Sequence, residues 1–256
     1  MKIEDNRLVR SEERLEGRAG WGKRFMAIKL YDLAGAEVNR RFSPYCWRIR
    51  MALAHKGLSV ETIPWRFSDK QVIAFSDSER VPVIVDGDRV VADSWAIANY
   101  LEDSYPDRPS LFEGTGGRAL SLLVNGWADT VMLAGLSKFA LLDIWRHVAE
   151  PDKAYFRASR EGRIGTTLEA FSADREQNLP SFRQALEFLR RTVKGREYLG
   201  GNHPLYADYI VFGGFQWVRA ISPFQILEPS DPVAQWRERM LDLFDGLGRR
   251  APGYPV

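Results

Sequence analysis

The chain has 256 residues, 45% of them apolar, and its 36 Lys and Arg nearly balance its 34 Asp and Glu, leaving a formal net charge of +2. A chain of this size can bury one large core or two small ones, and a balanced charge without long runs of one sign argues against nucleic-acid binding. The single cysteine excludes an intramolecular disulfide, and the three histidines lie far apart, so we expect no metal site.

The first 25 residues are charged throughout and lack the apolar segment of a secretory signal. We expect a cytoplasmic protein in which residues 1–25 are a disordered extension, or the product of a start codon set too early. No membrane span is expected, because Asp129, Lys138 and Asp143 interrupt the longest apolar candidate before it reaches about 18–20 residues.

The first half of the chain predicts a βαβ-ββα order over residues 26–105. AIKLYDL, residues 27–33, alternates apolar and polar positions as a strand does. A helix then begins at Ser43, a favoured N-cap followed by proline, and ends near Gly57. Residues 59–65 form a second strand, which a right-handed crossover should make parallel to the first.

A polar loop leads from the second strand to VPVIVDGDRVVADS, where two β-rich runs flank an Asp-Gly-Asp turn and indicate a hairpin. A helix capped by Asp93 or Ser94 then runs to about Pro106. Residues 106–118 have the Pro- and Gly-rich composition of a linker. The remainder, residues 119–256, is expected to be all-helical, with helical spacing over 119–149, 152–193, 206–222 and 233–248. The predicted class is α+β, a sheet domain followed by a helical bundle.

Four features occur together: S-P-Y-C at residues 43–46, Val81-Pro82 before the third strand, Asp93-Ser94 before the last helix of the unit, and a helical second domain. Over roughly residues 27–222 this combination resembles the glutathione transferase superfamily, whose N-terminal domain is thioredoxin-like. The segments FSPYCWR and ADYIVFGGFQWVR look most similar to the bacterial β-etherase-like branch and to related fungal transferases.

In this resemblance, the Ser43 hydroxyl donates a hydrogen bond to the glutathione sulfur at a helix N-terminus and favours the thiolate. Lowering a thiol pKa by about two units from about 8.5 requires about 2.7 kcal/mol. One charge-assisted hydrogen bond of about 1.5–3 kcal/mol and a helix end of about 0.3–1 kcal/mol supply it. The alternative is that Ser43 only caps its helix.

Cys46 is the rival nucleophile, because C-P-Y-C is the redox motif of glutaredoxins and Ser43 stands where their attacking cysteine would be. Here the first thiol is missing, and Cys46 shares an apolar helix face with Ile49 and Leu53. An inert, packed cysteine is the favoured interpretation.

The resemblance also assigns residues to glutathione. The backbone of Val81, before a cis Pro82, would pair with the cysteinyl backbone of glutathione, and Asp93 and Ser94 would bind its γ-glutamyl end. Candidates for the glycyl carboxylate are Lys70, Gln71 and Arg80.

The electrophile is expected between the serine and the helical domain. Asn39, Tyr45 and Trp47 flank Ser43, and Trp127 and Trp217 are candidate aromatic walls. Asp208 matches the aspartate of the family's capping box in a core helix, although Leu205 replaces the usual Ser or Thr.

The resemblance therefore predicts a glutathione S-transferase that uses glutathione as co-substrate, acts on a hydrophobic, aromatic electrophile and serves detoxification as a cytoplasmic homodimer. Aryl ether cleavage is the reaction that the branch suggests. A non-catalytic carrier of apolar ligands and a Cys46-dependent thiol exchanger stay open as alternatives.

Overall fold

The computed structural model describes residues 27–256, so the predicted extension lies outside the described residues. A four-stranded sheet in the order β2-β1-β3-β4 forms the first domain. It contains β1 (Ile28–Leu33), β2 (Val60–Trp65), β3 (Val83–Asp86) and β4 (Arg89–Ala92). β1 and β2 are parallel, as the crossover predicts, and β3 pairs antiparallel with both β1 and β4.

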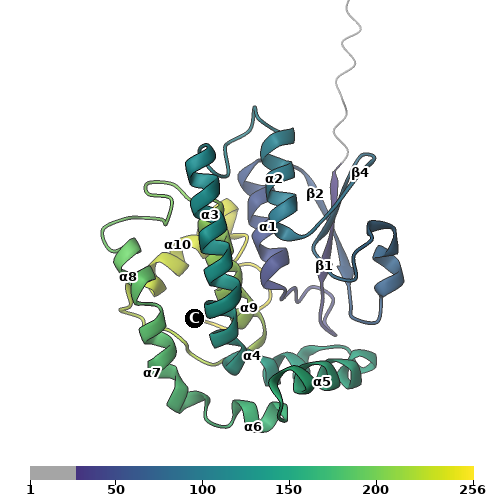
Figure 1. The fold of residues 1–256 in the computed structure, drawn as a ribbon, viewed down its shortest axis with the longest axis vertical. Coiled ribbons are helices and arrows are strands. Elements are labelled where there is room, and N and C mark those ends of the chain that lie inside the picture. Colours follow the sequence, from purple (N-terminus) through teal and green to yellow (C-terminus); the bar gives the residue numbers. More distant parts are fainter. Residues whose placement is uncertain (1–26) are drawn as a thin grey trace, which may run out of the picture.

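Two helices of this domain, α1 (Pro44–His55) and α2 (Ser94–Ser104), lie between the sheet and the helical domain (Figure 1). Both begin where the sequence predicts, because Ser43 and Asp93 each accept a hydrogen bond from the first turn. The segment expected to be a plain loop contains a short 3₁₀ helix, η1 (Lys70–Ser76), whose Ile73 is buried. The expected α+β class is confirmed.

The helical domain begins earlier than expected. Thr115–Arg118, placed in the predicted linker, form the first turn of α3 (Thr115–Trp127), because the two glycines there accept helical geometry after Gly114 turns the chain with φ 100°. The remaining elements are η2, a π-helical turn (Ala128–Met132), α4 (Leu133–His147), α5 (Glu150–Ile164), α6 (Leu168–Ser172), α7 (Arg175–Ala185), α8 (Glu187–Val193), α9 (Tyr206–Ile221) and α10 (Pro232–Gly246).

α9 is the central helix of the molecule and packs against α1, α3 and α4. Gly213 allows the close approach of α9 to α1, because a Cβ at that position would lie 2.4 Å from the carbonyl oxygen of Pro44. The start of α9 is fixed by the buried Asp208, whose carboxylate accepts hydrogen bonds from Leu199 N (2.7 Å), Leu205 N (3.0 Å) and the Trp236 indole (2.9 Å). α9 thereby holds the first turn of α1, which carries Ser43.

The continuous helical stretch Thr115–His147 contains an 18-residue window of mean hydropathy 1.4, so it is long and apolar enough to cross a membrane by length and composition alone. Asp129, Lys138 and Asp143, which were expected to exclude a membrane span, do not exclude one by length and hydropathy. Each is nevertheless paired inside the fold: Asp129 with Arg48, Lys138 with Asp174, and Asp143 with Arg146 and Arg175. The stretch packs against α9 and α6, and 28% of its 18-residue apolar window is buried inside the fold.

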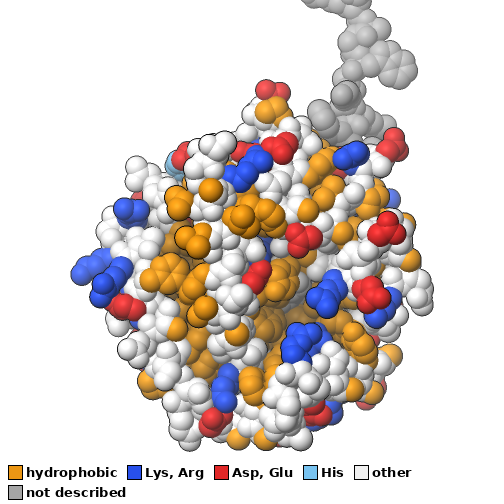
Figure 2. Space-filling model, viewed as in Figure 1, with side chains coloured by type: hydrophobic (Ala, Val, Ile, Leu, Met, Phe, Trp, Pro, Cys, Tyr) orange, Lys and Arg blue, Asp and Glu red, His pale blue; other side chains and the backbone are white. Residues whose placement is uncertain are grey.

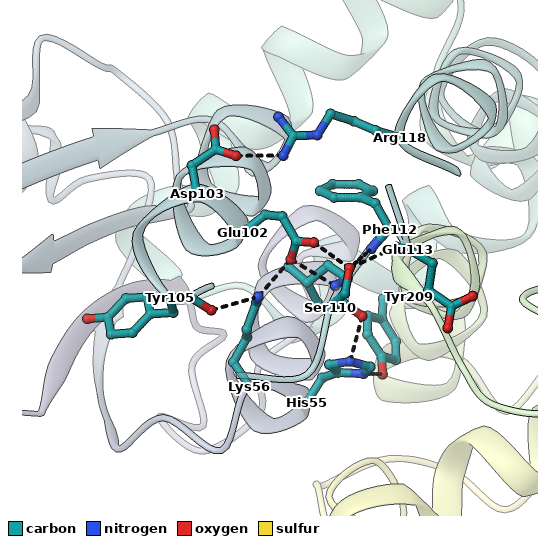
Figure 3. Close-up of polar contacts among 11 residues, drawn as sticks. His55, Lys56, Glu102, Asp103, Tyr105, Ser110, Phe112, Glu113, Arg118 and Tyr209 are labelled. Atoms are coloured by element: carbon teal, nitrogen blue, oxygen red, sulfur yellow. Dashed lines mark hydrogen bonds and ion pairs between the residues drawn. The ribbon is translucent and has the colours of Figure 1, made fainter. Parts of the chain in front are cut away.

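A polar cluster, which we call the junction, connects the end of α1 to α2 and to the segment before α3 (Figure 3). Lys56 is 1% exposed, and its Nζ lies 2.7 Å from Glu102 Oε2. The same carboxylate accepts hydrogen bonds from Leu111 N (2.9 Å) and from the Ser110 hydroxyl. His55 donates from Nε2 to Ser110 O (3.0 Å), so its Nδ1 accepts from the Tyr209 hydroxyl (2.6 Å).

Candidate functional site

A cavity of about 600 Å³ lies between the sheet domain and α4 and α5. This volume is within the usual range for small-molecule sites. Figure 2 shows a hollow lined by hydrophobic side chains, with Lys and Arg side chains gathered along one edge. The first turn of α1 and the loop before β3 form the wall on the sheet side, and α4 and α5 close the opposite side.

Ser43 borders this cavity at the N-terminus of α1. It is 4% exposed, and its Oγ accepts a hydrogen bond from Cys46 N over 3.2 Å. Because that bond uses a lone pair, the hydroxyl proton is available to an acceptor in the cavity. The helix N-terminus also favours a negative charge at this point. The Ser43 side chain can therefore cap α1 and donate a hydrogen bond to an anionic ligand at the same time.

Cys46 is fully buried and does not border the cavity. Burial, and secondarily the nearby Asp32, raises the pKa of the Cys46 thiol well above its usual value. A protonated, enclosed thiol is a poor nucleophile, so this geometry disfavours disulfide exchange at Cys46.

The Val81-Pro82 peptide bond is cis. Val81 borders the cavity, and no other group of residues 27–256 forms a hydrogen bond with its backbone N–H or C=O. These two groups can therefore pair with an extended ligand backbone, as an added strand would.

Asp93 has φ 76°, and its Oδ1 accepts hydrogen bonds from Trp95 N (2.9 Å) and Ala96 N (3.0 Å). Ser94 is 3% exposed, and its carbonyl oxygen accepts a bond from the Tyr206 hydroxyl (2.8 Å). Neither residue borders the main cavity.

Tyr45 and Trp217 border the cavity, as the sequence predicts for pocket walls. Burial, and next the charge of Asp129, raises the pKa of Tyr45, so its hydroxyl remains a neutral hydrogen-bond donor. Asp129 is carried by the π-helical turn η2 and pairs with the buried Arg48, 2.7 Å away.

Three expected wall residues lie elsewhere. Trp47 is wrongly predicted as a pocket residue, because its side chain is fully buried and its indole N–H donates to Arg41 O (2.9 Å). Trp127 does not border the cavity and packs edge-on against Phe188, with ring centroids 4.4 Å apart. Asn39 is exposed in the turn before α1 and likewise stays outside the cavity.

Among the candidates for the glycyl carboxylate, Lys70 and Arg80 border the cavity and Gln71 does not. Lys70 Nζ lies 3.5 Å from Glu79 Oε2 and 5.7 Å from the Tyr155 ring centroid. The site can therefore offer two cations from the sheet domain to an anionic ligand.

Further walls, which the sequence does not predict, come from the segment after β2 and from α5, chiefly Phe67, Tyr155, Phe156, Arg160 and Arg163. Helical spacing places Phe156, Arg160 and Arg163 on one face, but it gives no sign that this face meets the sheet domain. The contact is made by the buried Asp152, which accepts hydrogen bonds from Phe67 N (3.3 Å) and Ser68 N (2.8 Å).

Within the part of the chain that the structure describes, no group of three or more His, Cys, Asp or Glu side chains could hold a metal ion.

Comparisons with known proteins match both domains. Residues 42–104 match the model of the glutathione S-transferase N-terminal domain, and residues 119–240 match that of the glutathione S-transferase C-terminal domain. Glutathione S-transferase Z2 of Arabidopsis thaliana is 34% identical over 108 residues, 40% of this chain and 47% of that protein. The probable glutathione S-transferase GSTU1 of Oryza sativa subsp. indica is 31% identical over 148 residues, 52% of this chain and 60% of that protein.

The chain spans about half the length of the first of these curated relatives. Solved structures align over more of it. Glutathione transferase GSTFuA3 of Phanerochaete chrysosporium has a TM-score of 0.70 and 26% identity, covering 87% of this chain and 93% of that chain. Glutathione S-transferase CsGST63524 of Ceriporiopsis subvermispora, solved in complex with glutathione, has a TM-score of 0.75 and 24% identity, covering 86% of this chain and 97% of that chain. The two domain models, in the order and position of the two observed domains, show that the chain belongs to the glutathione S-transferase superfamily.

Proposed function

We propose that this protein is a glutathione S-transferase in which the Ser43 hydroxyl stabilises the thiolate of bound glutathione for attack on an aromatic electrophile. The observation that carries the proposal is the position of Ser43, which borders the cavity at the N-terminus of α1. A hydrogen-bond donor and a helix end both favour thiolate over thiol, and Cys46 offers no competing nucleophile.

Glutathione would lie along the sheet-domain wall of the cavity. The backbone groups of Val81 would pair with its cysteinyl residue, and Lys70 and Arg80 would face its glycyl carboxylate. The γ-glutamyl end would meet Ser94 and the start of α2, with Asp93 near the ammonium group. Pro82, which the resemblance also assigns to the glutathione site, is joined to Val81 by a cis peptide bond. Gln71 is the weaker candidate, because it does not border the cavity.

The electrophile would lie toward α4 and α5, where Phe67, Tyr155 and Phe156 form an aromatic wall. The thiolate sulfur forms a bond to the electrophilic carbon, and the leaving group departs with its bonding electron pair. With an aryl halide a halide ion leaves, and with an aryl ether a phenolate leaves and is protonated by solvent. Aryl ether cleavage is the finer proposal, and it follows from the sequence likeness to the β-etherase-like branch.

The test is turnover of a panel of aryl halide, epoxide and aryl ether substrates with glutathione. Ser43→Ala should lower kcat/KM by 10-fold or more, the equivalent of losing one charge-assisted hydrogen bond. Cys46→Ala should retain activity, and Tyr45→Phe is the matched control for loss of a different cavity hydroxyl. Activity lost in Cys46→Ala and kept in Ser43→Ala would establish the thiol exchanger instead. Tight glutathione binding without any turnover would favour the carrier.

The homodimer is also a proposal. Leu120 (65% exposed), Leu123 (70%) and Val131 (44%) present apolar side chains along α3 and η2. An apolar helix face of this kind is typical of an interface between subunits. Sedimentation at micromolar concentration should give twice the chain mass, and Leu120→Ser with Leu123→Ser should give monomers. The cytoplasmic location and the detoxification role stay predictions from the sequence.

A further inference from the structure

Two arginines of α5 reach the cavity from the side opposite Ser43. Arg160 and Arg163 are three residues apart, so they share a helix face, and both border the cavity. The Arg160 guanidinium lies 4.7 Å from the ring centroid of Phe156 and 5.4 Å from that of Phe67. Its Nη1 contacts Ser159 Oγ at 2.7 Å. Aromatic faces and a hydroxyl therefore hold this head group, which leaves its other N–H donors available to a ligand.

The charges of the cavity wall do not balance. Lys70, Arg80, Arg160 and Arg163 border it, with only Glu79 and Asp129 as acidic neighbours. Glu79 pairs with Lys70, and Asp129 pairs with Arg48. Within residues 27–256, no carboxylate forms an ion pair with Arg80, Arg160 or Arg163.

Arg157, on the same helix, differs from Arg160 and Arg163 because it has carboxylate partners. Arg157 bonds to Glu161 (2.7 Å) and to Glu169 (2.7 Å). For Arg160, burial first and then the charges of Arg163 and Arg80 lower the pKa of the guanidinium, which remains charged at neutral pH. Arg160 is half-buried beside aromatic rings and Arg80 and Arg163 are exposed, and a bound anion would relieve the repulsion among these three cations.

Glutathione does not account for all of these cations. Its glycyl carboxylate is one anionic group, for which the sheet domain already presents Lys70 and Arg80. Arg160 and Arg163, which we call the α5 pair, lie on the wall assigned to the electrophile, beside the aromatic side chains. Planar guanidinium groups match a carboxylate in a bidentate manner, which favours that group as the ligand.

We propose that the electrophile is an aromatic carboxylate whose anionic group binds Arg160 and Arg163 while its ring packs on the adjoining aromatic wall. The inference rests on the proposed function, because it takes the glutathione thiol to point into the same cavity. It changes the expected substrate class from neutral hydrophobic compounds to anionic aromatic ones.

The test uses two glutathione conjugates that differ only at the carboxyl group of the aromatic ring, S-(4-carboxy-2-nitrophenyl)glutathione and the same compound with that ring carboxylate as its methyl ester. Isothermal titration measures the affinity of each for the full chain, with glutathione itself as a third ligand. Wild type should bind the carboxylate about 10-fold or more tightly than the ester, the usual worth of one charge-assisted hydrogen bond. Raising the salt concentration should narrow this difference.

Variants assign the preference to the α5 pair. Arg160→Gln should remove most of the preference for the carboxylate and change ester and glutathione affinities less than about 3-fold, and Arg160→Lys should restore part of it. Arg163→Gln should act in the same direction. Arg157→Gln, which removes the same charge from the outward side of α5, should leave the preference unchanged.

The outcomes separate this inference from the function on which it rests. Equal wild-type affinity for the two conjugates, with glutathione still bound as thiolate, overturns the inference and leaves the transferase standing. Equal weakening of all three ligands by Arg160→Gln also overturns it, because the α5 pair would then hold the glycyl carboxylate. If neither conjugate nor glutathione binds, both proposals fall.

Discussion

The junction and the cavity both contain buried or half-buried charges, but they differ in how those charges are paired. At the junction, Lys56 and Glu102 form an ion pair, and Leu111 N and the Ser110 hydroxyl satisfy the carboxylate further (Figure 3). In the cavity, Arg160 contacts rings and one hydroxyl, and within the described chain it has no carboxylate partner. Paired buried charges join α1 to α2 and to the segment before α3, whereas charges left without a partner beside a cavity are available to a ligand.

The largest expected effect is at the junction. Lys56→Met should lower the free energy of unfolding by about 3–5 kcal/mol, because it leaves the Glu102 carboxylate without its buried partner. Urea denaturation measures this change. The double variant Lys56→Met with Glu102→Leu should recover much of the loss, and the KM for glutathione should not change in either protein. A single variant as stable as wild type would show that the ion pair does not stabilise the packing of α1 against α2.

Asp152→Ala should have an intermediate effect on both stability and binding. It removes hydrogen bonds to Phe67 N and Ser68 N, so we expect a loss of about 2–3 kcal/mol in unfolding free energy. Since Phe67 is part of the cavity wall, electrophile KM should rise while glutathione affinity stays the same. Unchanged electrophile KM would show that α5 and the segment after β2 do not depend on this contact.

The junction should also respond to pH through His55. Burial lowers the pKa of His55, so the folded protein keeps it neutral, with Lys56 opposing and Glu102 favouring protonation. Because the unfolded chain binds the proton near pH 6.5, stability is fully present above that pH and falls below it, by up to about 1.4 kcal/mol per pH unit. Burial lowers the pKa of His147 too, so His55→Gln should reduce the slope between pH 7.5 and 5.5 without abolishing it. An unchanged slope in urea denaturation would contradict this account.

The smallest expected effect on stability is in the cavity. Arg160→Gln removes no ion pair within residues 27–256, so its unfolding free energy should stay within about 0.5 kcal/mol of wild type. Arg157→Gln, with two carboxylate partners, should cost more by the same measurement. A loss of several kcal/mol in Arg160→Gln would show that this arginine is structural, and it would weaken the contrast between the two regions.

The sequence predicted the elements whose signals are local. Caps at Ser43 and Asp93, the Asp-Gly turn and alternating strands each depend on a few adjacent residues, and all of them appear in the structure. The start of α3 was placed too late, because the glycines that suggest a linker lie inside its first turn. Composition cannot separate a flexible glycine from one accommodated in a helix.

Most of the candidate site that follows from the sequence lies on the sheet-domain side, and Trp217 is the one predicted wall of the helical domain that borders the cavity. Ser43 and Val81 follow from motifs, whereas Phe67, Phe156 and Arg160 meet through packing between segments far apart in the chain. Trp47 illustrates the same limit, because its position next to Ser43 suggested the cavity and its helix face directs it into the core. Neighbours in sequence on a helix point in different directions, and only the packed structure decides which direction meets a ligand.

The most direct test of the account is the ultraviolet thiolate absorbance of bound glutathione as a function of pH, for wild type and Ser43→Ala. Wild type should show a thiol pKa well below about 8.5, and the variant should still bind glutathione and lose the shift. If Ser43→Ala keeps the lowered pKa, or if wild type binds glutathione without lowering it, then Ser43 does not activate the thiol and the central claim is wrong.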